Sequence, residues 1–215
     1  MLFRYRNDMN AHENPGKPPV PANEARRLKV LWQYEVLDSV PEEIFDDLTE
    51  LAARICEAPI ALISLVDENR QWFKSRIGIT LKETSRDVSF CAHAIAQPDL
   101  FIIPDATKDK RFAHNPVVVS EPKIRFYAGA PLITADGYAL GTLCVIDKVP
   151  RQLRHDQQQA LRILARHVVS QLELRRRSRE LADVRAESRK LKAQLEQARA
   201  QLAKGRRTGD HKPAK

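Results

Sequence analysis

Three cysteines are the side chains of this 215-residue sequence best suited to covalent chemistry. Cys91 follows Ser89, a good cap for a short helix, and the dipole at the start of that helix would lower the thiol pKa and favour a nucleophile. Cys144 lies on a predicted strand that also faces Thr142, where it could line a pocket or belong to the core. Cys56 has apolar neighbours at helical spacing, which predicts a buried thiol. There is no Cys-x-x-Cys pair to indicate zinc or a redox couple, so reduced thiols are expected.

The elements that must position these residues follow from hydrophobic periodicity. Residues 59–67 are apolar at both alternating positions, as in a central strand covered on both faces. Asp136-Gly137 separates two strand-like runs, a strong hairpin signal. The predicted order is a helix at 23–37, a second helix from 41 that includes 55, strands at 59–67 and 71–77, a short helix at 89–96, strands at 100–104, 125–134 and 138–147, and a long helix from 155 to about 203. This order predicts an α+β fold with helices on the faces of an antiparallel sheet.

Burial within the first two helices is predicted from the same spacing. Arg27 is expected to stay in water, while Leu51 and Ile55 are expected to join the buried stripe of the second helix. Trp72 could line a pocket, although packing against Trp32 or the first helix is the commoner use of such a residue.

The net charge of +8 is concentrated in the C-terminal part of the chain. Residues 175–215 hold 14 Lys and Arg against 5 Asp and Glu, whereas the rest of the chain holds 22 against 23. No aromatic residue follows Tyr138, so the basic segment cannot stack bases and nucleic acid is an unlikely partner. The basic excess fits a solvated helix face or a contact with an acidic partner. With no membrane span or signal peptide in the sequence, a cytoplasmic protein is expected.

The end of the long helix has the pattern of a coiled coil. Apolar or small residues are spaced alternately three and four apart at Leu181, Val184, Ser188, Leu191, Leu195, Ala198 and Leu202. Such a narrow seam has little to bury alone, which favours pairing in a parallel homodimer, with a frayed surface helix as the alternative. The predicted organisation is a disordered segment at 1–22, a sensor domain at 23–175, a coiled-coil signalling helix at 176–204 and a basic disordered tail at 205–215.

Four segments together resemble the GAF domains found at the front of bacterial sensor kinases and diguanylate cyclases. They are Pro59-Ile-Ala-Leu-Ile-Ser-Leu-Val-Asp-Glu-Asn-Arg-Gln-Trp-Phe-Lys-Ser75, Ser89-Phe-Cys-Ala-His-Ala-Ile95, Ile124-Arg-Phe-Tyr-Ala-Gly-Ala-Pro-Leu132 and Leu140-Gly-Thr-Leu-Cys-Val-Ile-Asp147. The resemblance spans residues 23–175. It implies a six-stranded antiparallel sheet with the terminal helices on one face and a ligand pocket under the loops of the other.

The resemblance places a pocket but does not select a ligand, because related domains bind cyclic nucleotides, bilins, haem or amino acids. The residues expected nearest the cavity are Phe90, Cys91, His93, Asp105, Arg111, Phe126, Tyr127 and Thr142. The aromatic members could equally be core, His93 could be structural, and Arg111 could only pair with a nearby aspartate. The Asn-Lys…Phe…Asp-Glu pattern of cyclic-nucleotide binders is absent. Cys91-Ala-His93 departs by one position from the Cys-His of bilin binders, and haem through His93 or His114 has equally little support.

Three functions are compatible with the sequence. The first is a ligand sensor without catalysis that signals through the dimeric helix to a separate kinase, cyclase or other partner. The second is a ligand-free dimerisation scaffold. The third is a thiol enzyme like the free methionine sulfoxide reductases, with Cys91 as the nucleophile. The cofactor or ligand is not identified by the sequence.

Overall fold

A computed structural model describes the backbone of residues 16–209 and the side chains of residues 16–199. Most of the predicted disordered lead-in, residues 1–15, lies outside the described residues, as does the end of the predicted tail, residues 210–215. The chain forms two compact units, one ending at Leu172 and the other beginning at Glu173. Each unit is described by itself.

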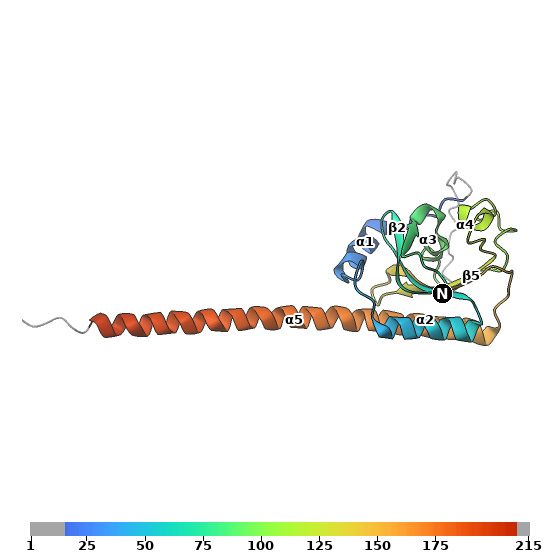
Figure 1. Ribbon diagram of the computed structural model, residues 1–215. Coiled ribbons are helices and arrows are strands. Elements are labelled where there is room, and N and C mark those ends of the chain that lie inside the picture. Colours follow the sequence, from blue (N-terminus) through green and yellow to red (C-terminus); the bar gives the residue numbers. More distant parts are fainter. Residues whose placement is uncertain (1–15, 210–215) are drawn as a thin grey trace, which may run out of the picture. The chain divides into compact units, whose positions relative to one another are not determined.

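The first unit is built on a six-stranded antiparallel sheet in the order β3-β2-β1-β6-β5-β4 (Figure 1). The strands are β1 (Ile60–Val66), β2 (Arg70–Ile77), β3 (Glu83–Ser85), β4 (Phe101–Ile103), β5 (Phe126–Ile133) and β6 (Ala139–Asp147). The predicted six-stranded α+β fold is confirmed, and β1 is central and buried along its whole length. Strand β3 was not predicted, because it has only three residues, none of them apolar.

The helices are α1 (Glu24–Gln33), α2 (Glu43–Cys56), α3 (Phe90–Ala94), α4 (Pro116–Val119) and α5 (His155–Gly209), with a 3-10 turn at Arg86–Val88. Helix α1 ends four residues before the predicted Leu37, and the chain turns there with a positive φ at Glu35. Ser89 caps α3 as predicted, accepting a hydrogen bond from the amide of Ala92. Helix α5 continues through residues 205–209, which were predicted to be disordered.

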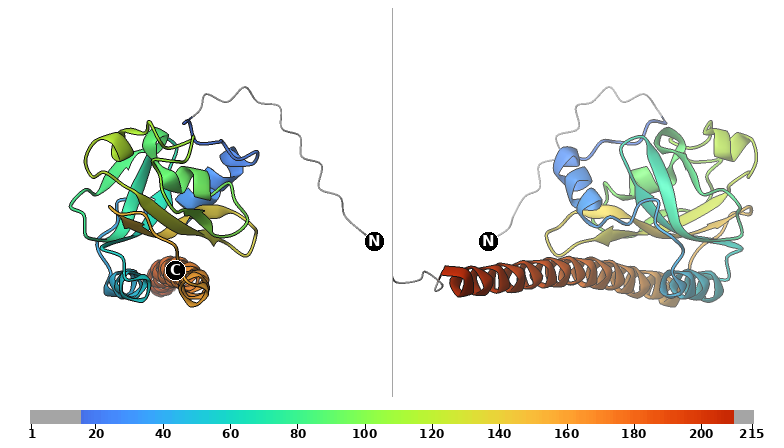
Figure 2. Two further views of the ribbon diagram at one scale, coloured as in Figure 1. Left: turned by 90° about the vertical axis from the view of Figure 1, so that its right-hand side faces the viewer. Right: turned by 60° about the vertical axis from the view of Figure 1, so that its left-hand side comes forward.

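The two faces of the sheet are covered differently. On one face α2 and the first turns of α5 lie side by side (Figure 1, Figure 2), and Phe45, Leu161 and Val168 pack there against the strands. On the other face α3, α4 and long loops form a second apolar cluster that includes Phe73 and Phe112. Because side chains alternate along each strand, every central strand contributes to both clusters.

Helix burial departs from the sequence expectation at three positions. Arg27 is 1% exposed, because its guanidinium is bonded to Glu24 at 2.8 Å and reaches the carbonyl of Ala139. Leu51 and Ile55 are 46% and 38% exposed, so their predicted burial was wrong. The face of α2 that meets the sheet instead carries Phe45, Leu48, Ala52, Ala53 and Cys56.

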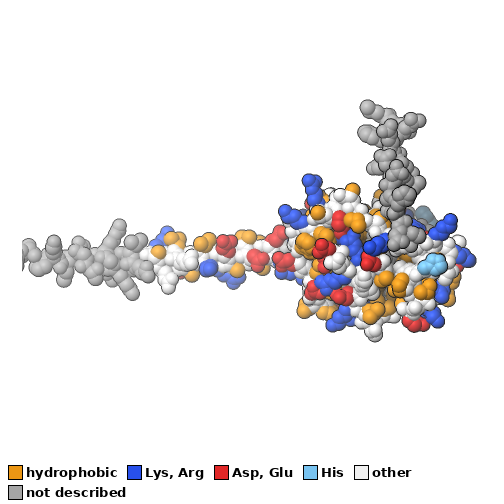
Figure 3. Space-filling view, turned by 90° about the horizontal axis from the view of Figure 1, so that it is seen from above, with side chains coloured by type: hydrophobic (Ala, Val, Ile, Leu, Met, Phe, Trp, Pro, Cys, Tyr) orange, Lys and Arg blue, Asp and Glu red, His pale blue; other side chains and the backbone are white. Residues whose placement is uncertain are grey.

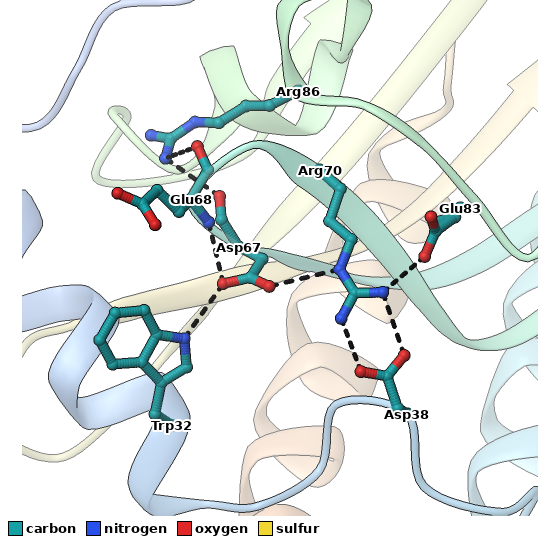
Figure 4. Close-up of polar contacts among 7 residues, drawn as sticks. All are labelled: Trp32, Asp38, Asp67, Glu68, Arg70, Glu83 and Arg86. Atoms are coloured by element: carbon teal, nitrogen blue, oxygen red, sulfur yellow. Dashed lines mark hydrogen bonds and ion pairs between the residues drawn. The ribbon is translucent and has the colours of Figure 1, made fainter.

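A network of charged side chains fastens α1 and the β1–β2 turn to the edge of the sheet (Figure 4). Arg70 donates to three carboxylates, those of Asp38, Glu83 and Asp67. Trp32 is half exposed rather than packed on Trp72, and its indole N–H donates to Asp67 at 3.1 Å. Together these bonds hold β3 in place, although it has little apolar surface of its own.

Within the second unit, α5 leaves its apolar residues exposed. Leu181, Val184, Leu191 and Leu195 are each 50% exposed or more, and Figure 3 shows apolar and charged side chains interspersed along the helix. Leu202 lies outside the described side chains. None of the helices in residues 16–209 is both long and apolar enough to span a membrane.

The Glu24 carboxylate provides a test of how α1 is held. Burial opposes its ionisation, but hydrogen bonds and charge from Arg27 and Arg86 outweigh this and lower its pKa from 4.5 to about 2. Glu24→Gln should therefore destabilise the protein by about 1–2 kcal/mol at neutral pH, measured by urea unfolding.

The pH dependence of that loss follows from the sign of the shift. A carboxylate whose pKa is lowered by folding stabilises the protein above pH 4.5, and this contribution disappears as the pH falls toward about 2. The gap between the wild-type protein and Glu24→Gln should therefore shrink over that window. Glu43→Gln, at an exposed position, is the matched control. A gap that stays constant from pH 7 to about pH 2 would contradict the ion-pair explanation.

Candidate functional site

A cavity in the described part of the chain lies on the sheet face opposite α2 and α5. Its volume is about 630 Å³, within the range of small-molecule sites. Strands β1 and β2 supply the floor through Leu62 and Phe73, and α3 supplies one wall through Phe90 and Cys91. The remaining lining residues come from β1, β2, β3, β5, β6 and α4, from the 3-10 turn and from the loops: Ile60, Gln71, Gly78, Ile79, Thr80, Leu81, Thr84, Val88, Val117, Glu121, Pro122, Ile124, Tyr127 and Ile146.

Cys91 faces this cavity with its sulfur in a small polar cluster. The Tyr127 hydroxyl donates to the Cys91 sulfur at 3.4 Å, and the sulfur of Cys144 lies 3.8 Å away. Gly129 makes this arrangement possible, because a Cβ at that position would come within 2.2 Å of the Tyr127 hydroxyl. The two thiols therefore sit as a buried pair, with Cys91 on the cavity side.

The two thiols differ in acidity. Burial raises the pKa of Cys91, but the polar side chains around its sulfur, Cys144 first and the donating Tyr127 hydroxyl among them, outweigh this effect and lower the pKa to about 6. Burial raises the pKa of Cys144, and the neighbouring Cys91 raises it further. If one thiol of the pair ionises, it is therefore Cys91, because its sulfur is the one surrounded by donors.

The amide of Gln71 connects the elements around the cavity. Its oxygen accepts hydrogen bonds from Ser89 at 2.5 Å and Ser64 at 3.3 Å, and its nitrogen donates to Thr84 at 2.6 Å. Because Ser89 also caps α3, the position of Cys91 depends on this amide. Gln71 was not among the predicted site residues, although its place in the predicted hairpin was known.

Comparison with known proteins decides the family. The model of the GAF domain matches residues 40–172. The chain belongs to the GAF domain family. It is also 48% identical, over 134 residues, to a cyclic di-GMP phosphodiesterase of Pseudomonas aeruginosa. That match covers 62% of this chain and only 23% of the relative, which is a much longer protein.

Solved structures share the GAF fold at low sequence identity. The GAF domain of an Acinetobacter phosphoenolpyruvate-protein phosphotransferase superposes with a TM-score of 0.53 at 18% identity, covering 71% of this chain and 93% of that one. Free methionine-R-sulfoxide reductase of Neisseria meningitidis, solved with its substrate, gives 0.53 at 18% identity, covering 72% and 92%. At this level of identity the likeness shows the fold alone.

The eight predicted pocket residues of the GAF domain do not all meet at the cavity. Phe90, Cys91 and Tyr127 line it. Thr142 lies in the polar cluster behind Cys91, where its buried hydroxyl makes no hydrogen bond with the described residues. Phe126 belongs to the cluster on the opposite face, since it precedes Tyr127 on β5 and side chains alternate there, which corrects its expected position.

His93, Arg111 and Asp105 lie away from the cavity. The imidazole of His93 is packed edge-on against Phe112, and burial and then the charge of Arg111 lower its pKa to about 4. Arg111 pairs with Asp109 at 2.7 Å and covers the ring of Phe101 at 4.9 Å. Asp105 lies in a separate surface cleft and accepts from Thr107. His93 and Arg111 are thus positioned as packing groups.

The apolar floor of the cavity was not predicted from the sequence, because its residues have the pattern of ordinary core residues. Leu62 and Phe73 alternate as strand residues must, and nothing in their types distinguishes a filled face from a hollow one. Thr84 could not be assigned, since β3 was not predicted. The one usable signal was Gln71, a polar residue on the inward side of a hairpin that is otherwise buried.

The acidity of Cys91 predicts a selective thiol reaction. Iodoacetamide, which is small and neutral, should alkylate Cys91 with a rate that rises around pH 6, because the thiolate is the nucleophile. Cys56 is an internal control, since burial raises its pKa to about 11 and it should stay unmodified at neutral pH. Peptide mass spectrometry of the labelled protein measures both sites.

A variant sharpens this test. Tyr127→Phe removes a donor to the Cys91 sulfur and should shift the alkylation profile of Cys91 to higher pH. If Cys91 instead reacts in parallel with Cys56, with no rise near pH 6, the polar cluster does not lower its pKa.

Proposed function

We propose that this protein is a non-catalytic sensory module that binds a small molecule in the cavity beside α3 and signals through α5. The observation that carries the proposal is the cavity itself: about 630 Å³, bounded by two central strands, a capped helix and β3. A pocket of this size with few polar groups is typical of a ligand site.

The sheet provides a route from the cavity to α5. Ile60, Leu62 and Ile146 contact the cavity, while their neighbours along the same strands, Ala61 and Val145, belong to the cluster that contains α5. A ligand that favours one arrangement of these strands would bias the packing of Leu161 and Val168 of α5 on the other face. The proposed ligand site and the proposed signalling helix therefore contact opposite faces of the same strands.

The second half of α5 supports signalling as a parallel dimer. Its seam runs through Leu181, Val184, Ser188, Leu191, Leu195 and Ala198, all exposed on the single chain and spaced as a coiled coil requires. We propose a second copy of this chain as the occupant of the seam. Burial of four large aliphatic residues per chain offers the stabilisation that the isolated helix lacks.

The output is proposed to lie in a partner or attached enzyme of a signalling pathway. Similarity to a cyclic di-GMP phosphodiesterase over the GAF region supports an enzyme of cyclic di-GMP turnover as that output. A kinase or cyclase is the alternative. The proposed role of the GAF domain is to regulate this output through α5.

A thiol enzyme is the second candidate, since Cys91 faces the cavity with Cys144 behind it. The lining argues against free methionine sulfoxide as its substrate. A free amino acid carries an ammonium and a carboxylate, and both need partners when they are buried. In the described part of the lining the one charged side chain is Glu121, 72% exposed at the rim. Sensing fits the site better than this reaction.

Retention of a ligand tests the sensory proposal. Native mass spectrometry of the purified full chain, together with its absorption spectrum, should show a bound metabolite that is released on denaturation. Repeated purification of an empty protein that also binds no added small molecule would support the scaffold function instead.

The seam predicts the oligomeric state. Leu191→Glu places a charge in the centre of the seam and should convert a dimer to a monomer in light scattering coupled to size exclusion. Lys190→Glu, one residue away on the outer side of the helix and exposed, is the matched control and should remain dimeric. A Leu191→Glu protein that stays fully dimeric would place the interface elsewhere.

A further inference from the structure

We infer that the ligand of the cavity beside α3 is an uncharged, predominantly apolar molecule. This inference rests on the proposed sensory function and specifies its ligand class. It follows from the charges and hydrogen bonds of the lining residues. The chemistry would exclude cyclic nucleotides, amino acids and tetrapyrroles with free propionates, each of which carries at least one ionic group.

The described part of the lining offers no cation to an anionic ligand. Among the described residues that line the cavity there is no lysine, arginine or histidine, and the one carboxylate is Glu121 at the rim. An anion moving from water into this part of the cavity would gain no counter-ion and would be repelled by that carboxylate, so its burial would be unfavourable. A cation would meet only a solvent-exposed carboxylate, which repays little of its desolvation.

Three cations close in sequence to the lining residues Glu121, Ile124 and Ile146 have partners. Lys123 and Lys148 approach Glu121 at 3.9 and 3.6 Å. Arg125 donates to the carbonyl groups of Val118 and Ile124, which holds it in the loop. Recruiting any of these groups to a ligand would therefore break existing contacts.

The polar groups of the cavity wall are also occupied. Gln71 bonds with Ser64, Ser89 and Thr84, and Tyr127 donates to Cys91. These two side chains therefore do not need a polar ligand to satisfy their hydrogen bonds. The rest of the wall surface is aliphatic or aromatic, as in Leu62, Phe73, Phe90, Val117, Ile124 and Ile146. Such a surface gains free energy by removing apolar ligand area from water.

Two fluorescent probes test the charge preference on a common ring skeleton. N-phenyl-1-naphthylamine is neutral, and 8-anilinonaphthalene-1-sulfonate adds one sulfonate to the same rings. Titrated into the full-length protein, the neutral probe should bind at least about tenfold more tightly, which corresponds to 1.4 kcal/mol. Equal or tighter binding of the sulfonate at the cavity would overturn the inference.

Paired variants locate the binding in the cavity. Val117→Trp fills the cavity from α4 and should abolish binding of the neutral probe, whereas Val119→Trp, on the same short helix but 58% exposed, should leave it unchanged. Ile79→Trp fills the cavity from the loop after β2. It provides an independent test in case Val117→Trp does not fold. Persistent binding in folded Val117→Trp and Ile79→Trp would place the probe elsewhere and contradict the inference.

A charge variant separates the ligand class from the sensory proposal. Ile79→Lys adds a cation to the lining and should reverse the preference toward the sulfonate. If the wild-type cavity binds the sulfonate better, the ligand class is wrong but the cavity remains a ligand site. If neither probe binds at the cavity and the purified protein is empty, the sensory proposal itself fails.

Discussion

The side-chain amide of Gln71 is the interaction on which the arrangement of the cavity depends. One carbonyl oxygen accepts from Ser64 on β1 and from Ser89, the cap of α3, while the amide nitrogen donates to Thr84 on β3. Gln71 on β2 thereby holds three elements, β1, β3 and α3, together at one corner of the cavity. Because buried polar groups must be paired, loss of this amide would leave several hydroxyl groups unsatisfied. Gln71 therefore connects β1, α3 and β3, which form the floor, one wall and the edge of the cavity.

The cavity lies on the sheet face that no long helix of the described residues covers. Helices α2 and α5 present Phe45, Leu161 and Val168 to the sheet and supply a continuous core. The other face receives only the short helices α3 and α4 with their loops, which cannot cover the strands completely. The continuously packed face of the sheet therefore carries α2 and the first turns of α5, and the incompletely covered face carries the cavity.

Sequence reasoning was sufficient for the features that depend on local pattern. A run that is apolar at both alternating positions identified β1 as central, Asp136-Gly137 marked the β5–β6 hairpin, and Ser89 was recognised as a cap. It failed where long-range contacts decide. Arg27 is buried because Glu24 pairs with it, and Phe126 faces α2 and α5 because the strand register places Tyr127 toward α3. No local pattern distinguishes a packed apolar face from one that leaves 630 Å³ open.

The central claim is that the cavity beside α3 is a binding site for an apolar ligand, formed by the unfilled face of the GAF sheet. The most direct measurement is a crystal structure of the full-length protein grown with N-phenyl-1-naphthylamine. The account predicts electron density for the probe between β1, β2 and α3, in contact with Phe73 and Cys91, with the Gln71 hydrogen bonds intact. A cavity closed by Leu81 and Val117, with the probe on the exposed seam of α5, would contradict it.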